Sequence, residues 1–378
     1  MKKILFYFQQ VGCANALLPL IEKWKSSYDI VITGRELVCN NLRKRAIKVY
    51  DYSELSFNNR INNNDSTWFK KFSPDIVITD TIDLTRVADG IVCRVFWQLA
   101  RKYNIPSMAY VDCWWGYCKR FILPDEVKIP ILPDHIAVID ELAQNDILNA
   151  GFPVEKILVL GSPKFEYLYK IARSNKKIQK SAARRNIGFK PDRFVILFVS
   201  QPIEKIFGRR STLGFTEKTT LKALLEVFSD FPKYLKTTLS IIILLHPEEE
   251  ENTLRNTVEK YSKDISVSFH KEDGTLNLLL AADLVVGMFS ILLAEAVIVN
   301  KPVLSVQLNF GQQEILITNT IGATCSIKSH RHLYDELFQS VSSEKHRMFL
   351  KEKQQKFKVV TDAYDRWDKM IKSLLKVS

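Results

Sequence analysis

The sequence lacks any long uninterrupted run of apolar residues. No stretch approaches the roughly 18 apolar residues that a membrane-spanning helix requires. Met1, Lys2 and Lys3 lead directly into a short apolar segment, 4–8, and then into a polar loop. This start has neither the apolar region nor the cleavage site of a signal peptide. We therefore expect a cytoplasmic protein.

Cysteine is scarce and scattered. The chain has six cysteines, of which Cys113 and Cys118 form one close pair. A tetrahedral zinc site of the common type needs a second pair, and none follows. We expect reduced thiols.

Acidic residues are too few to balance the basic ones. Lysine and arginine total 54 against 42 aspartates and glutamates, a formal net charge of +12. Such an excess of positive charge is typical of proteins that bind nucleic acid, an anionic membrane surface or phosphate-bearing ligands. No zinc finger, RNA-recognition signature or evident recognition helix accompanies the basic residues. We therefore expect no nucleic-acid partner and favour a membrane surface or a phosphorylated ligand.

Apolar runs of strand length alternate with longer amphipathic stretches. This alternation predicts βαβ units and parallel sheets. Two series of strands are expected, the first at 4–8, 30–33, 76–79, 107–111, 135–139 and 157–160, and the second at 194–199, 240–245, 284–286 and 302–306. Because 378 residues exceed one ordinary core, the repeated pattern indicates two α/β domains.

The domain boundaries follow from composition. We place an N-terminal domain at 1–165, a linker at 166–190, a C-terminal domain at 191–348 and a terminal helix at 349–378. The linker is basic and ends near Gly188 and Pro191, which interrupt regular structure. Apolar residues at helical spacing in the last segment predict a helix that packs back on the N-terminal domain.

The most informative segment is 282–305, which has the pattern strand, short turn, helix, loop, strand. Ser290 stands where the helix begins, so it can cap the helix beside N–H groups that suit a phosphate. Glu295 lies further into the helix, where it could accept hydrogen bonds from ribose hydroxyls. The alternative is that Ser290 is only a cap and Glu295 only a solvated helix residue.

Three segments together resemble one superfamily. Segment 282–305 resembles the donor-binding region of GT-B glycosyltransferases. The segment between the two domains of those enzymes is similar to residues 161–168 here, which read Gly161-Ser162-Pro163-Lys164-Phe165-Glu166-Tyr167-Leu168. That superfamily includes the non-hydrolysing UDP-N-acetylglucosamine 2-epimerases. Segment 12–20 resembles the first loop and helix of the same fold. The resemblance implies an α/β GT-B architecture, in which two Rossmann-like domains face a central cleft.

His246 and Pro247 end a strongly apolar strand. Proline suits the first position of a helix, which would place His246 at the cap. The combination of this His-Pro with Ser290 is similar to bacterial sialyltransferases, Kdo transferases and teichoic-acid polymerases, where such groups bind the donor phosphate. The resemblance implies that His246 binds the donor and assists departure of its phosphate; a neutral capping histidine is the alternative. Gln201 and Gln307 also end strands and are candidate donor ligands, unless they only complete the loop and the strand.

A general base for the acceptor must come from the N-terminal domain. Asp80, Asp83 and Asp112 follow strands, and we choose Asp112 because Trp114 and Trp115 follow it with faces that can stack on sugars. The alternative is that Asp112 caps a turn and the tryptophans are core. Gly12 and Asn15 of the first loop are further acceptor candidates.

No Asp-x-Asp pair is present at these strand ends, because two residues separate Asp80 from Asp83. We therefore expect no metal and no cofactor.

The sequence predicts an inverting glycosyltransferase that moves a sugar from a UDP- or CMP-linked donor to a glycan or lipid-linked acceptor. We expect it to act in bacterial surface polysaccharide biosynthesis and to associate peripherally with the inner face of the plasma membrane. A sugar-nucleotide 2-epimerase of the same fold and a non-catalytic basic protein that binds polysaccharide or nucleic acid remain alternatives.

Overall fold

The chain divides into two compact units in the computed structural model. Unit 1 comprises Met1–Tyr167 and Val359–Ser378, and unit 2 comprises Leu168–Lys358. The structure describes residues 1–51, 67–84, 92–122, 131–174, 176–188, 192–261, 265–271 and 274–377. The segment 166–190, expected as a linker, contains most of helix α7 (Pro163–Arg173) and all of α8 (Lys176–Asn186).

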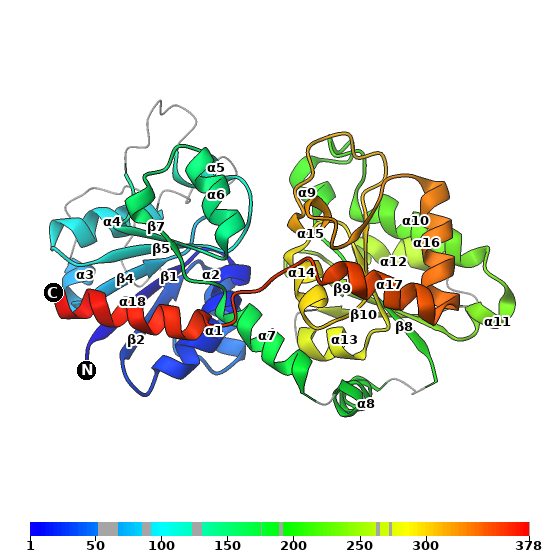
Figure 1. Cartoon of the computed structure of the whole chain (residues 1–378), viewed down its shortest axis with the longest axis horizontal. Coiled ribbons are helices and arrows are strands. Elements are labelled where there is room, and N and C mark those ends of the chain that lie inside the picture. The colour runs from blue at the N-terminus through cyan, green and yellow to red at the C-terminus, as the bar shows by residue number, and fades with distance from the viewer. Residues whose placement is uncertain are drawn as a thin grey trace. The chain divides into compact units, whose positions relative to one another are not determined.

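Unit 1 is built on a parallel sheet (Figure 1). Its strands lie in the order β3-β2-β1-β4-β5-β6-β7 within the described residues. Their bounds are β1 Lys3–Phe8, β2 Asp29–Gly34, β3 Tyr50–Asp51, β4 Ile76–Thr79, β5 Ser107–Val111, β6 His135–Val138 and β7 Ile157–Val159. The order reverses between β1 and β4, which makes that point the topological switch of the sheet.

The helices of unit 1 connect these strands. They are α1 Val11–Trp24, α2 Glu36–Lys44, α3 Thr67–Phe72, α4 Val92–Lys102, α5 Tyr117–Phe121, α6 Glu141–Asn149, the short 3₁₀ helix η3 Val154–Lys156 and the C-terminal α18 Ala363–Val377. The central strands are apolar on both faces because helices cover a parallel sheet on both sides. Ile4 to Phe8 of β1 and all of β5 are accordingly buried.

The C-terminal segment returns to unit 1. The Nε1–H of Trp367 donates to the carbonyl of Gly161 at 3.1 Å, and the backbone N–H of Tyr364 donates to the carboxylate of Glu166 at 2.8 Å. Gly161 has a φ of +79°, and a Cβ there would lie 2.7 Å from Val360. Segment 161–168 therefore requires its glycine and glutamate to pack against α18, the red helix in Figure 1, which also contacts the end of α1.

Replacement of Trp367 by alanine tests this docking. Trp367 is fully buried and packs edge-on against Trp24 and Tyr110, so its loss is expected to destabilise unit 1 by about 3–5 kcal/mol. Urea unfolding followed by circular dichroism measures the change. Tyr234→Ala, at a site that is 67% exposed, is the control. If the unfolding of unit 1 in urea were the same in Trp367→Ala as in the wild type, packing of α18 on unit 1 would be contradicted.

Unit 2 contains a second parallel sheet, in the order β10-β9-β8-β11-β12-β13 over the described residues. Its strands are β8 Phe194–Val199, β9 Leu239–Leu245, β10 Ser266–Lys271, β11 Leu284–Gly287, β12 Val303–Val306 and β13 Cys325–Ile327. Besides α8, its helices are α9 Ile203–Phe207, α10 Glu217–Ser229, α11 Lys233–Lys236, α12 Asn252–Glu259, α13 Thr275–Ala281, α14 Ile291–Ile298, α15 Ile317–Thr320, α16 His330–Ser342 and α17 Glu344–Gln354. The switch in strand order lies between β8 and β11.

Every strand predicted from the sequence forms, with ends within one residue of those expected. The short strands β3 and β13 and the more polar β10 were not predicted. Helix α8 packs on α13, where Lys180 and Arg184 both pair with Asp283. This helix is therefore an integral part of unit 2.

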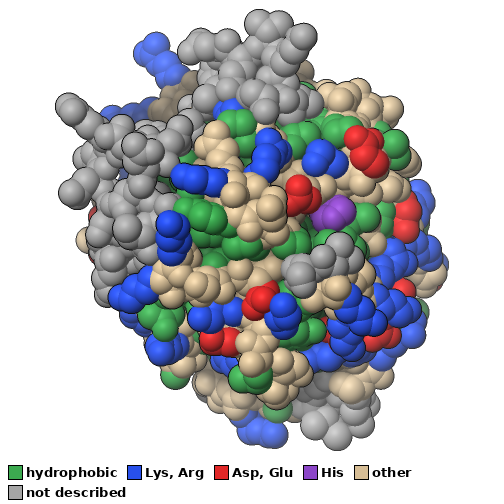
Figure 2. Space-filling view, turned by 90° about the vertical axis from the view of Figure 1, so that its left-hand side faces the viewer, with side chains coloured by type: hydrophobic (Ala, Val, Ile, Leu, Met, Phe, Trp, Pro, Cys, Tyr) green, Lys and Arg blue, Asp and Glu red, His purple; other side chains and the backbone are tan. Residues whose placement is uncertain are grey.

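One face of the molecule is mixed in charge. On the face shown in Figure 2, lysine and arginine side chains lie among acidic and hydrophobic ones. No helix within the described residues is both long enough and apolar enough to cross a membrane.

Candidate functional site

The sequence-predicted donor residues meet at one edge of unit 2. Gln201 lies just after β8, His246 follows β9, Ser290 lies just after β11 and Gln307 follows β12. All these strands are parallel neighbours, so their carboxyl ends lie at the same edge of the sheet. This edge includes the switch point between β8 and β11, where open α/β sheets bind ligands.

The turn between β11 and α14 is tightly built. A Cβ on Gly287 would lie 3.2 Å from the carbonyl oxygen of Val199 and 3.0 Å from Leu293, so only glycine fits without a shift. Ser290 is the N-cap of α14, and its Oγ accepts from the backbone N–H of Leu292 at 3.3 Å. The capping prediction is thus confirmed. The positive end of α14 lies at the switch point.

Two glutamines hold this turn in place. Gln201 accepts from the backbone N–H of Phe289 through Oε1 at 3.0 Å. Gln307 donates through Nε2 to the carbonyl of Met288 at 3.2 Å and to Glu314 at 3.0 Å. Gln307 is 0% exposed and completes the turn from within the core, and its role as a donor ligand stays a prediction. Gln201 remains half-buried beside the turn.

Glu295 is buried, with 4% of its surface exposed. The alternative of a solvated helix residue is therefore excluded. Its neighbours in α14 are almost all apolar and buried, and a carboxylate in such a helix is costly unless it serves an interaction. Glu295 and Ser290 belong to the same short helix, α14, so the Glu295 carboxyl group lies near the turn at Ser290.

His246 lies in a turn and not at a helix start. Helix α12 begins only at Asn252, which corrects the expectation from Pro247. The turn forms because Glu249 accepts from the backbone N–H of His246 at 2.7 Å and from the hydroxyl of Ser200 at 2.7 Å. Adjacent residues Ser200 and Gln201 thus link the His246 turn to the Ser290 turn.

The imidazole of His246 is neutral at physiological pH. Burial lowers its pKa below the usual histidine value, against the attraction of Glu248. Its Nδ1 accepts from the backbone N–H of Glu248 at 3.2 Å. The ring proton therefore resides on Nε2, which can donate to an anionic ligand.

The switch point of unit 1 brings together the ends of β1, β4 and β5. Asp80 follows β4, and one of its oxygens accepts from the backbone N–H groups of Gln9 and Gln10 at 2.7 and 2.8 Å. Asp80 is 0% exposed, and burial raises its pKa to about 8 despite these hydrogen bonds. Asp80 is therefore protonated at neutral pH and holds the first loop.

Asp80 variants should separate its hydrogen bonds from its charge. Asp80→Asn keeps an acceptor oxygen and should change the free energy of unfolding by less than about 1 kcal/mol, whereas Asp80→Ala should cost about 2–4 kcal/mol. The folded pKa lies above the unfolded one, so ionisation opposes folding. The wild type should therefore lose stability relative to Asp80→Asn as the pH rises from about 4 to about 8, and the difference should level off above that. Chemical unfolding at several pH values measures both effects, and equal losses in the two variants would contradict this assignment.

Asp112, at the end of β5, is half-buried beside the same loop. A Cβ on exposed Gly12, in the first turn of α1, would lie 3.8 Å from its carboxylate, so α1 leaves room next to this oxygen. Burial raises the pKa of Asp112, and the positive charges of Arg120 and Lys164 oppose that rise. The result is a carboxylate with increased basicity, as a general base requires.

The two tryptophans after Asp112 differ. Trp114 is 7% exposed, donates through Nε1 to Asp140 at 2.8 Å and stacks on Phe165, so it belongs to the core and its expected contact with the acceptor is wrong. Trp115 is half-buried, and the guanidinium of Arg120 lies 5.7 Å from its ring centroid. On α1, Asn15 has a buried Oδ1 that accepts no hydrogen bond from the residues that the structure describes.

Sequence reasoning missed Arg120, Ser200 and Glu249. Arg120 is 7% exposed and donates to the carbonyl of Thr81 at 2.9 Å. Nothing in the short segment 117–121 distinguishes a buried arginine from a surface one. Glu249 stands in a run of glutamates, and only the folded turn shows that it accepts from His246 and Ser200.

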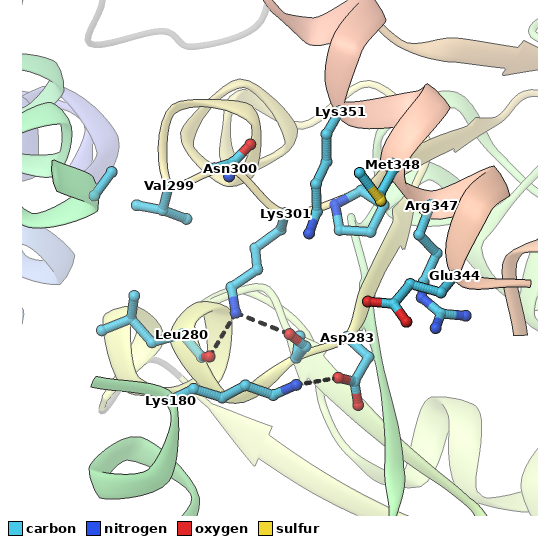
Figure 3. Close-up of a pocket in the computed structure, with 13 residues that line it drawn as sticks. Lys180, Leu280, Asp283, Val299, Asn300, Lys301, Glu344, Arg347, Met348 and Lys351 are labelled. Carbon is cyan, nitrogen blue, oxygen red and sulfur yellow. Dashed lines mark hydrogen bonds and ion pairs between the residues drawn. The ribbon is translucent and has the colours of Figure 1, made fainter. Parts of the chain in front are cut away.

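A separate pocket of about 300 Å³ lies at the amino ends of β11 and β12 (Figure 3). Lys301 points at two backbone carbonyls, those of Leu280 at 2.6 Å and Ala282 at 2.9 Å, and Lys180 pairs with Asp283. Burial lowers the pKa of Lys301 to about 7. Lys301 and Lys180 therefore make hydrogen bonds and an ion pair at the amino ends of the strands, whereas Ser290 lies at their carboxyl ends.

Comparison with solved structures identifies the fold. S. aureus MnaA, in a structure with UDP, matches at a TM-score of 0.65 and 17% identity, over 100% of this chain and 98% of that one. The Neisseria meningitidis UDP-GlcNAc 2-epimerase bound to UDP-GlcNAc matches at 0.65 and 17%, over 99% and 100%. A glycosyltransferase from Rickettsia africae matches at 0.61 and 16%, over 100% and 99%. No family model and no curated protein matches. The architecture is GT-B, as predicted.

Proposed function

We propose that this chain is an enzyme that acts on a pyrimidine nucleotide sugar and transfers the sugar to a glycan or lipid-linked acceptor. The observation behind this proposal is the turn at the unit 2 switch point, where Ser290 caps α14 and Gln201 braces the preceding residue. A helix start at a switch point suits the phosphates of a nucleotide.

We assign the donor to unit 2. The N–H groups at the start of α14 and Nε2–H of His246 would bind the phosphates, and Glu295 would accept from the ribose. Gln201 and Gln307 position the turn. Donors of this kind stabilise the charge that develops on a departing phosphate, so the proposed reaction uses no metal. Bound UDP in the S. aureus structure and UDP-GlcNAc in the Neisseria structure favour UDP as the nucleotide.

We assign the acceptor to unit 1, near Gly12, Asn15 and Trp115, with Asp112 as the general base. Of the three strand-end aspartates, Asp80 and Asp83 are 0% and 7% exposed, whereas Asp112 is half-buried. One accessible carboxylate suffices to deprotonate an acceptor hydroxyl in an inverting transfer. The net charge of +12 is compatible with an anionic, lipid-linked acceptor at the inner face of the plasma membrane.

A 2-epimerase is the second candidate, because the S. aureus and Neisseria likenesses support it at least as well. An epimerase must remove a proton from one face of a carbon and return one to the other face, which normally uses acid–base groups on both sides. Among the three strand-end aspartates only Asp112 is accessible, and this favours transfer.

Incubation with labelled UDP- and CMP-linked sugars separates the candidates. Transfer releases free nucleotide in proportion to added acceptor, whereas epimerisation yields an isomeric nucleotide sugar without any acceptor. Binding of nucleic acid with a steep salt dependence and no response to nucleotides would instead support the non-catalytic alternative. A melting-temperature panel with UDP, CDP, CMP and GDP identifies the nucleotide, because a ligand of the folded state stabilises it.

A further inference from the structure

A cysteine, a histidine and a glutamate converge at the edge of the unit 2 sheet. Cys325 opens the edge strand β13, and His332 and Glu336 lie four residues apart on α16, so both point from one face of that helix. One ligand atom from each residue lies within 4.8 Å of the other two. Neither the proposed donor site nor the proposed acceptor site uses these residues.

The distances approach those of a tetrahedral metal site. Sγ of Cys325 lies 4.0 Å from Nε2 of His332, and that nitrogen lies 3.4 Å from Oε1 of Glu336. In a tetrahedral zinc site, bond lengths of about 2.0–2.3 Å place neighbouring ligand atoms roughly 3.4–3.6 Å apart. The His332–Glu336 pair already has this spacing, and a shift of about half an ångström by the half-exposed His332 would give it to the Cys325–His332 pair.

A second histidine supports the carboxylate. Nε2 of His346, on α17, lies 3.0 Å from Oε2 of Glu336. The side chains of Glu336 and His346 are only 18% and 13% exposed. This contact leaves Oε1 of Glu336 facing His332, and outer groups usually fix metal-binding carboxylates in this way.

We propose that Cys325, His332 and Glu336 bind a zinc ion that ties β13 to α16, with His346 as the positioning residue for Glu336. Thiolate and imidazole select zinc over magnesium, which prefers oxygen ligands. On binding, the zinc–sulfur bond replaces the S–H bond of Cys325, and the proton passes to the buffer. A water completes the fourth position.

Zinc binding to the full chain without a polyhistidine tag tests this proposal. The protein is treated with chelator, dialysed into a non-thiol reductant and titrated with zinc sulfate, and bound metal is quantified after a second dialysis. We expect one zinc per chain and a rise in melting temperature of about 5 °C, since zinc binds the folded state preferentially. Magnesium should give neither effect.

Matched variants locate the ion. Cys325→Ser and His332→Ala should each abolish retention, whereas His330→Ala, an exposed histidine two residues away, should retain one zinc. Equal melting temperatures of the metal-free proteins would show that the variants fold. Zinc should also protect Cys325 from alkylation while exposed Cys118 still reacts. Absence of retained zinc, or retention that survives both ligand substitutions and so reflects an adventitious ion only, would overturn the proposal.

Discussion

Asp112→Asn should lower kcat by roughly two to four orders of magnitude and leave nucleotide affinity nearly unchanged. The amide keeps the size of the side chain but cannot accept the acceptor proton, and general-base catalysis contributes about this factor. Nucleotide affinity should persist because Asp112 belongs to unit 1 and the proposed donor groups belong to unit 2. Steady-state kinetics and calorimetry measure the two effects separately.

The pH profile of the same variant provides a second readout. Burial raises the pKa of Asp112, so wild-type kcat should fall on acidification at a pH above the ordinary aspartate value of about 3.9. The residual activity of Asp112→Asn should lack that limb. Asp80→Asn is the matched control, since Asp80 is buried and already protonated at neutral pH. Full activity in Asp112→Asn would move the base to another residue.

Ser290→Asp should weaken nucleotide binding strongly without loss of stability. Aspartate is as good an N-cap as serine, so α14 keeps its cap. Its carboxylate, however, would stand where the phosphates are proposed to bind. Like charges about 5 Å apart cost about 2–3 kcal/mol near a protein surface, which corresponds to roughly a 30- to 150-fold loss of affinity.

The control for this effect is the same change at another cap. Ser343 caps α17 by accepting from the backbone N–H of His346 at 3.2 Å, so Ser343→Asp should leave both affinity and melting temperature nearly unchanged. If Ser290 served only as a cap, Ser290→Asp would behave like this control. Unchanged nucleotide affinity in Ser290→Asp would therefore remove support for the donor site.

Much of the fold could be predicted from the sequence because buried parallel strands are continuous apolar runs. All seven residues of β9 are buried, and its sequence contains only one polar residue. The edge strand β10 reads Ser-Val-Ser-Phe-His-Lys and is only partly buried. Because polar residues interrupt its apolar ones, β10 does not form a continuous apolar run and could not be recognised as a buried strand. Strands β3 and β13 are too short to show a hydrophobic pattern.

The role of a site residue could be predicted from the sequence only where its position relative to a strand or helix end determines that role. Ser290 follows a strand and starts a helix, so its capping role could be inferred from local pattern. The burial of Gln307 and Trp114 depends on partners distant in sequence, Met288 and Asp140. The turn at His246 depends on which backbone N–H the Glu249 carboxylate accepts from. No local pattern contains that information.

Calorimetric titration of UDP into the full chain, in the presence of chelator, tests the central claim most directly. The claim is that the switch point of unit 2 binds a nucleotide without a metal. We predict saturable binding at one site per chain, a raised melting temperature and a loss of at least about 30-fold in Ser290→Asp. Absence of binding for UDP, CDP and CMP, or binding that appears only after a divalent metal is added, would contradict it.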